Sequence, residues 1–164
     1  MRFLHISCNW FKKFQNPKQL GTRHEFVSPA GSVGRFIYDV RKIDRKSGKP
    51  KQSAFTPERH PDTGQFETSV CGRNGVTDER FWFLGNAIRP GLEALAAVEI
   101  SVANIQLSGL RCEPTPETQP IDYPEHGVIV GWDPGEDKEK RMAAQQELAA
   151  NSSRVLWPSS RVRY

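Results

Sequence analysis

Two histidines and two cysteines in the central part of the chain are of the residue types that bind zinc and transfer protons. They are His60, Cys71, Cys112 and His126. Zinc accepts all four side chains, but structural zinc sites usually bring their ligands in pairs separated by about two to four residues. No such pair occurs among these four residues. The sequence therefore predicts neither a metal site nor a bound cofactor.

The cysteines are predicted to be free thiols with structural roles. Cys8, Cys71 and Cys112 are an odd number, lie far apart and form no C-x-x-C pair. A reducing compartment keeps such thiols reduced, and buried thiols behave as small hydrophobic groups. Nucleophilic catalysis would require Cys71 or Cys112 to meet a histidine in the folded chain. No known sequence signature surrounds either cysteine, so the structural role is favoured.

His60 and His126 define an enzyme hypothesis. His60 lies in PERHPD and His126 in DYPEH, so each has neighbouring carboxylates that can orient an imidazole for general acid–base catalysis. Both are expected at loop or strand ends, where functional residues collect. The hypothesis is a small hydrolase or nuclease that uses one of them. Its structural alternative is an isolated surface histidine beside acidic residues.

A phosphate-binding loop of the nucleotide-hydrolase type is not predicted. The segment AGSVGRF contains two glycines. It lacks the terminal G-K-[ST] and leads into a predicted strand, whereas a phosphate-binding loop opens a helix whose N-terminus meets the phosphate. Nucleotide hydrolysis of that type is therefore excluded.

Positive charge is concentrated in the first part of the chain. The net charge is +4, from 23 Lys and Arg against 19 Asp and Glu. Residues 1–60 contain 13 basic and 4 acidic residues, which gives +9, and the remaining residues therefore carry −5. Such an asymmetry indicates that the two parts face different partners, or each other.

A basic β-hairpin is predicted within this first part. Residues 35–43 alternate as a strand, Ser47 and Gly48 turn the chain, and residues 51–56 return as a second strand. Basic groups near the turn would meet phosphates, and Phe36, Tyr38 and Phe55 on its body would stack on bases. The leading hypothesis is a non-enzymatic module that binds RNA or DNA, or a small subunit of a nucleoprotein or protein complex. The predicted nucleic-acid-binding residues are Arg35, Arg41, Lys42, Arg45, Lys46, Lys49 and Lys51.

An acidic segment at residues 113–137 supports a third hypothesis. It contains seven carboxylates and no Lys or Arg. The simplest interpretation is a solvated acidic loop. The alternative is a surface that binds a basic protein partner, including the basic hairpin of another copy of the chain. The carboxylates are those of Glu113, Glu117, Asp122, Glu125, Asp133, Glu136 and Asp137.

The remaining patterns predict a short-element α+β domain. Strands are expected at residues 66–71, 97–100, 110–113 and 126–132, with a last edge strand at 154–158. A helix is expected at residues 77–84 with Thr77 as its N-cap and Gly85 as its stop. A second, short helix is expected to be capped by Ser101, to run through Ser108 and to be stopped by Gly109. The longest helix is expected at residues 134–151, with Asp133 as N-cap.

The predicted fold class is α+β: a small mixed, mostly antiparallel sheet of five or six short strands, covered on one side by about three helices. Residues 1–24 are predicted to form an N-terminal arm, residues 25–157 a single domain, and residues 158–164 a C-terminal tail. No apolar run is long enough to span a bilayer, and the N-terminus makes a poor signal peptide. A cytoplasmic location without membrane association is therefore expected.

Overall fold

The computed structural model describes residue 26, residues 28–135 and residues 137–159. The predicted arm at residues 1–24 and most of the predicted tail lie outside the described residues. The domain boundaries proposed from the sequence therefore stay predictions.

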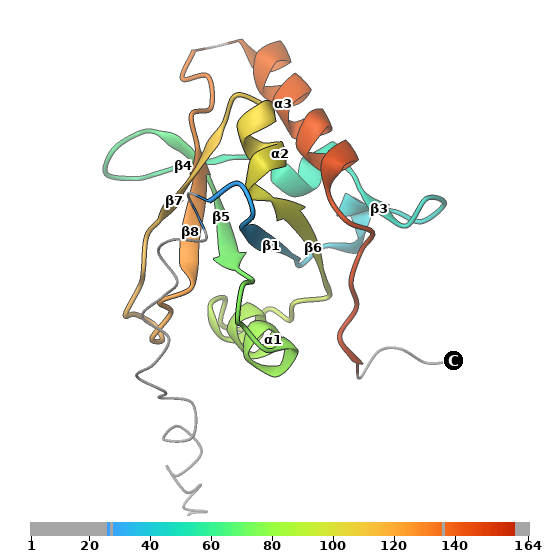
Figure 1. The fold of residues 1–164 in the computed structure, drawn as a ribbon, viewed down its shortest axis with the longest axis vertical. Coiled ribbons are helices and arrows are strands. Elements are labelled where there is room, and N and C mark those ends of the chain that lie inside the picture. Colours follow the sequence, from blue (N-terminus) through green and yellow to red (C-terminus); the bar gives the residue numbers. More distant parts are fainter. Residues whose placement is uncertain (1–25, 27, 136, 160–164) are drawn as a thin grey trace, which may run out of the picture.

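The main sheet has five strands in the order β6-β1-β5-β8-β7, and a short sixth strand, β4, pairs with β5. All of these pairings are antiparallel. A separate pair, β2 and β3, forms a small hairpin beside the main sheet (Figure 1). The strands are β1 (Ser32–Ile37), β2 (Ile43–Asp44), β3 (Lys49–Pro50), β4 (Glu58–Arg59), β5 (Phe66–Gly72), β6 (Ala96–Ser101), β7 (Arg111–Pro114) and β8 (His126–Val130).

Three α-helices complete the described fold, with two short 3-10 helices around the small hairpin. The predicted class, an antiparallel α+β sheet of about six strands with its longest helix near the C-terminus, is confirmed. Among the described residues, none of the helices combines the length and apolarity that a bilayer crossing requires. The helices are α1 (Asp78–Ala87), α2 (Val102–Leu107) and α3 (Lys138–Asn151), with η3 (Val40–Lys42) and η4 (Gln52–Phe55).

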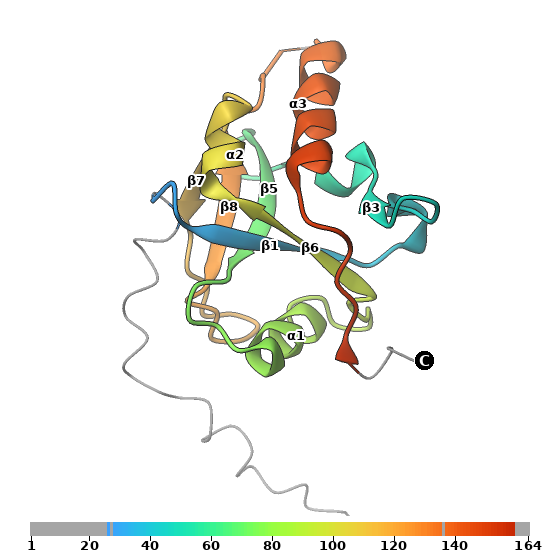
Figure 2. The same ribbon diagram turned by 45° about the vertical axis from the view of Figure 1, so that its right-hand side comes forward.

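The sheet is covered on both faces, not on one as the sequence predicted. Helices α2 and α3 lie on one side of it and α1 on the other (Figure 2). Val33 and Ile37 of β1 belong to the apolar cluster under α2 and α3, whereas Phe36 belongs to the cluster with α1. Successive strand residues point to opposite faces, so a strand that is buried on both sides shows no polar face. This explains why β1 and β8 are almost entirely buried.

Helix α1 begins where the local signals place it but ends later. The Thr77 hydroxyl accepts a hydrogen bond from the Arg80 backbone N–H, which confirms the predicted N-cap. Gly85, predicted to stop the helix, lies inside it and is buried. A Cβ there would stand 2.7 Å from the Phe36 ring. Gly85 is therefore explained by close packing of the helix on the sheet and not by a helix end.

Helix α3 starts four residues later than predicted. Asp137, not Asp133, is its N-cap and accepts from the backbone N–H groups of Glu139 and Lys140. The Asp133 carboxylate instead accepts from Gly135 N and closes a tight turn. Both aspartates satisfy the local chemistry of an N-cap, so the sequence offers two starting points.

The predicted basic hairpin is much shorter than expected. β2 and β3 pair through two residue pairs, and residues 52–55 form η4 in place of a returning strand. Phe36 and Phe55 are buried in the two apolar clusters, and the hydroxyl of half-buried Tyr38 donates to the Gly85 carbonyl. The prediction that these rings form a base-stacking surface is therefore wrong, because a domain of this size needs them for its core.

Candidate functional site: an arginine-lined pocket and a basic surface

Strands β1 and β5 separate within the sheet and leave a notch. They pair through Val33 and Gly34 opposite Gly72 and Cys71. The rest of β1 pairs on its other side, with β6. Outside this paired region, a backbone carbonyl of β5 that faces β1 receives no hydrogen bond from that strand. A buried carbonyl needs a hydrogen-bond donor.

Arg35 fills the notch. Its side chain is 9% exposed, its Nη1 donates to the carbonyl of Ser69 at 2.8 Å, and its Nε donates to the carbonyl of Ala54 at 3.3 Å. These two bonds hold the guanidinium in one orientation. Burial, followed by the positive charge of Arg89, lowers the pKa of Arg35. A guanidinium nevertheless stays protonated in proteins, so a buried positive charge stands in the sheet.

A pocket of about 140 Å³ opens beside Arg35. Its walls come from the end of β1, the middle of β5, the segment that follows α1, the loop that leads into β8 and the first residue of β8. Apolar side chains form part of the wall, and polar side chains converge on it from all of these elements. The polar side chains relevant to its chemistry are Arg35, Tyr38, Ser69, Arg89, Glu117 and His126.

His126 is held in the pocket wall in a defined orientation. Its Nδ1 lies 2.7 Å from the carbonyl oxygen of Thr115 and 3.4 Å from Oε1 of Glu117. A carbonyl accepts and does not donate, so Nδ1 carries the proton in the neutral ring. The lone pair is then on Nε2, which no described side chain or backbone group contacts by a hydrogen bond. A second protein group that orients the ring in this way is typical of acid–base histidines.

Two tyrosines on the pocket wall remain neutral. Burial raises the pKa of Tyr38 to about 12, and its hydroxyl donates to a backbone carbonyl of α1. Burial likewise raises the pKa of Tyr123 well above its usual value. Arg89 lies over the Tyr38 ring, 5.1 Å from its centroid, and pairs with Glu58 at 3.3 Å. The positive charges of the pocket therefore belong to Arg35 and Arg89.

The two described cysteines, Cys71 and Cys112, are buried and form no disulfide. Cys71 is opposite His126 in the β5–β8 register, but it packs with Phe81 and Leu84 of α1 and does not line the pocket. Burial raises the pKa of Cys112 to about 12, so its thiol is protonated at neutral pH. Only a thiolate is a strong nucleophile, which argues against catalysis by Cys112.

His60 lies outside the pocket. Its Nδ1 accepts from the backbone N–H groups of Asp62 and Thr63, at 3.2 and 3.3 Å, and so closes the loop between β4 and β5. In the part of the chain that the structure describes, no group of three or more His, Cys, Asp or Glu is arranged to hold a metal ion. His60, Cys71, Cys112 and His126 therefore do not form the zinc site that their types would permit.

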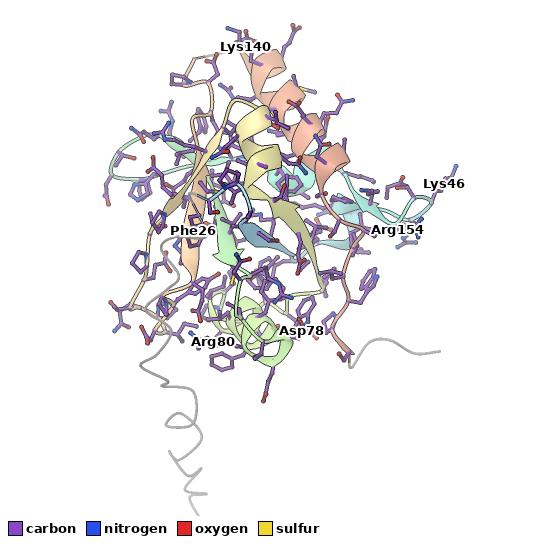
Figure 3. All side chains as sticks on the ribbon, in the orientation of Figure 1. Phe26, Lys46, Asp78, Arg80, Lys140 and Arg154 are labelled. Atoms are coloured by element: carbon purple, nitrogen blue, oxygen red, sulfur yellow. The ribbon has the colours of Figure 1, made fainter. Side chains whose placement is uncertain are left out.

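The basic residues of the small hairpin form an exposed group that is separate from Arg35. We define the basic surface as Arg45, Lys46, Lys51 and Arg154, all exposed. Arg154 joins it because Val155 N donates to Gly48 O at the hairpin turn. Lys46 points away from the body of the protein, and Arg154 lies on the neighbouring C-terminal segment (Figure 3). None of the four forms an ion pair with a carboxylate of the described residues.

The other predicted nucleic-acid-binding residues have local partners. Arg41 is exposed and pairs with Asp39 at 2.8 Å. Lys49 donates through Nζ to the carbonyl of Ser152, which ties the C-terminal segment to the hairpin. Burial, and then the charge of Arg35, lowers the pKa of half-buried Lys42. Lys42 thus lies within electrostatic range of the pocket.

The acidic segment is not a uniform solvated loop. Glu125 is 1% exposed, and its carboxylate accepts two hydrogen bonds from Arg80, at 3.1 and 3.0 Å. Glu113 pairs with Arg111, and Glu117 faces His126. These carboxylates have structural partners within the chain, which leaves fewer of them for a basic protein partner.

The sequence did not predict the pocket. Its one local signal is a single arginine inside an otherwise apolar strand, SVGRFI. Nothing in the sequence shows that β1 and β5 separate beyond Gly34, or that the loop before β8 closes over the gap. Neither a known family model, nor a curated protein, nor a solved structure matches this chain.

Proposed function

We propose that this protein is a non-enzymatic module that binds RNA or DNA through the basic surface. The observation that supports this most directly is the set of four exposed basic side chains around the β2–β3 turn, none of which pairs with a carboxylate of the described residues. Phosphate contacts by Lys and Arg release counterions from the nucleic acid, and this term supplies essentially all of non-specific binding. The module would therefore recognise the phosphate backbone and not a base sequence.

The burial of the aromatic rings shapes this proposal. Stacking on aromatic side chains contributes about 1–3 kcal/mol per base in single-strand-binding proteins. Phe36 and Phe55 are 6% and 0% exposed, so they do not present such a surface. Trp157, 45% exposed, follows Arg154 on the C-terminal segment. Binding is therefore expected to be salt-sensitive and weakly dependent on sequence.

A charge-reversal triple variant tests the proposal. Arg45→Glu, Lys46→Glu and Lys51→Glu together should weaken binding to a labelled mixed-sequence oligonucleotide by more than about tenfold at low salt. The slope of log Kd against log salt should decrease by about three, one for each lost phosphate contact. Fluorescence polarisation at several salt concentrations measures both. Lys49 is left intact because it anchors the C-terminal segment.

The matched control makes the same change of net charge elsewhere. Arg111, Lys138 and Lys140 are exposed, and Lys140 lies at the start of α3, away from Lys46 of the small hairpin (Figure 3). If the triple Glu variant of these residues weakens binding as much as the hairpin variant does, net charge and not the basic surface explains the affinity. A ratio of absorbance at 260 to 280 nm raised by copurified nucleic acid would support the proposal independently.

The orientation of His126 favours a second candidate function, a small hydrolase or nuclease. Its Nδ1 is fixed by Thr115 and Glu117, which leaves Nε2 without a hydrogen-bond partner among the described residues, and general acid–base catalysis would use that nitrogen. Arg35 would stabilise negative charge that develops on a substrate at the same place.

Cleavage assays on labelled RNA and DNA test this second candidate. If the chain cleaves either one, His126→Gln should reduce the rate by about 100-fold or more, the usual contribution of a general acid or base. His60→Gln is the matched control, since His60 serves the loop between β4 and β5, and its rate should stay unchanged. Absence of cleavage, or cleavage that survives His126→Gln, would reject the candidate.

A further inference from the structure

We infer that the pocket beside Arg35 binds a phosphate monoester group, held between Arg35 and Arg89. The inference does not depend on the basic surface, because the two sites use different residues. It begins with a buried charge that has no counterion in direct contact, since Glu58 acts on it only at longer range. Arg35 forms no ion pair with a carboxylate of the described residues, and the Glu58 carboxylate pairs with Arg89 instead. A buried cation without a counterion is unfavourable, so an anion in the pocket would stabilise the folded protein.

The guanidinium of Arg35 is oriented in advance for such an anion. Of its five N–H groups, two donate to acceptors in the described chain, the carbonyls of Ala54 and Ser69. Its Nη2 donates to no described residue. The two backbone bonds fix the plane of the group, so little rotational freedom would be lost when an anion binds. Arginine in this situation presents a planar pair of donors that matches two oxygens of a phosphate.

Other groups in the wall supply further donors. Arg89 provides a second positive charge, and Ser69 provides a hydroxyl that has no hydrogen-bond partner within the described chain. His126 Nε2 accepts a hydrogen bond when neutral, or donates one when protonated. Arg89 is already paired with Glu58, so the excess positive charge is that of Arg35. A phosphate monoester is favoured over a carboxylate because it offers three terminal oxygens to the donors of Arg35, Arg89 and Ser69. Glu117 opposes an anion, but its Oε1 lies toward His126 Nδ1, at 3.4 Å.

The size of the pocket and its surroundings restrict the ligand further. About 140 Å³ accommodates a compact anionic group with little attached to it. The group can come from a free small phosphate ester or from the phosphorylated end of a nucleic-acid strand. Lys42 is within electrostatic range of Arg35 and precedes the small hairpin, so either source has a charged approach to the pocket.

Isothermal titration of the full chain tests the inference with four probes. They are inorganic phosphate, acetate, a 5′-phosphorylated dinucleotide and the same dinucleotide with a free 5′-hydroxyl. Phosphate and the phosphorylated dinucleotide should bind saturably, and acetate should bind at least about tenfold more weakly. Tighter binding of the phosphorylated dinucleotide than of phosphate would show that the pocket takes the phosphorylated end of a nucleic-acid strand. Equal affinities would indicate that it takes a free phosphate ester. No saturable binding of either, or equal binding of acetate, would overturn the inference.

Variants locate the binding in the pocket. Arg89→Met should weaken phosphate binding by about tenfold or more, because it removes a charge-assisted hydrogen bond. Arg111→Met, at an exposed position elsewhere, should have no effect. Arg35→Lys keeps the charge but loses the planar donors, and it should weaken binding further if circular dichroism shows that it folds. Unchanged phosphate affinity in both Arg89→Met and Ser69→Ala would overturn the inference, even if Arg35→Lys fails to fold. The hairpin triple variant should keep its affinity for phosphate, which separates this site from the basic surface.

Discussion

Glu125→Ala is expected to lower the free energy of unfolding by about 3–5 kcal/mol, because it removes one partner of a buried ion pair. Glu125 is 1% exposed, and the Arg80 side chain is 14% exposed. Both carboxylate oxygens accept from Arg80, which also donates to the carbonyl of Asp122. The variant would leave a largely buried guanidinium with one backbone acceptor. Urea denaturation followed by circular dichroism measures the change.

A surface ion pair of the same chemistry is the control for Glu125. Glu113 pairs with Arg111 at 2.7 Å, but the two side chains are 46% and 64% exposed. Glu113→Ala should therefore cost less than about 1 kcal/mol, since exposed pairs contribute little. Equal losses for the two variants would contradict the argument from burial.

The Glu125 pair also connects the fold to the pocket. Arg80 lies on α1 (Figure 3), whereas Glu125 belongs to the loop that carries Tyr123 and leads into His126 of β8. The ion pair thus holds the loop against the helix that covers this face of the sheet. Loss of stability in Glu125→Ala should be accompanied by weaker binding of inorganic phosphate if the pocket binds it as we infer. Glu113→Ala should leave phosphate binding unchanged.

Phe81→Ala is expected to destabilise the fold by about 3–5 kcal/mol, the usual cost of truncating a buried aromatic side chain. Phe81 is 1% exposed, its ring lies 4.4 Å from that of Phe36, and the Arg73 guanidinium lies 4.2 Å from its centroid. It is the ring through which α1 packs on β1. Leu107→Ala, at a 77% exposed position, is the control and should cost less than about 0.5 kcal/mol. Chemical denaturation measures both.

A double-mutant cycle with Gly34 tests whether the ring determines this packing. A Cβ on Gly34 would stand 2.5 Å from the Phe81 ring, so Gly34→Ala alone should be destabilising. In the Phe81→Ala background the same methyl group would enter the space left by the ring and cost less. A coupling energy near zero would show that the two positions are independent and that the packing argument is wrong.

Local chemistry made several elements predictable. Thr77 and Ser101 cap α1 and α2 as predicted, and Gly75 and Gly109 adopt the positive φ angles of 74° and 75° that end a turn and a helix. In each case the determining interaction joins residues that are close in the sequence. The fold class followed from the same short strands and helices, because their order favours antiparallel pairing.

Interactions between residues that are distant in the sequence determined the features of the fold that local chemistry did not. Gly85 has the sequence signal of a helix stop, yet it lies inside α1. A glycine is needed there because the Phe36 ring occupies the space that a side chain would fill. The turn at Ser47 and Gly48 predicts a returning strand at residues 51–56, but Phe55 is buried in the apolar cluster under α3 and residues 52–55 form η4. Packing against a distant partner contributes more than a weak local preference, so it overrides the pattern.

The candidate sites divide in the same way. The sequence by itself determined the concentration of basic residues around the β2–β3 turn, since charge there depends on composition alone. Only the tertiary structure decided that Arg35 is buried in a notch and that His126, 91 positions later, lines the same pocket. The physical reason is that a pocket forms where strands separate and loops meet. Separation of β1 from β5 depends on which strands pair, and no residue pattern within either strand records it.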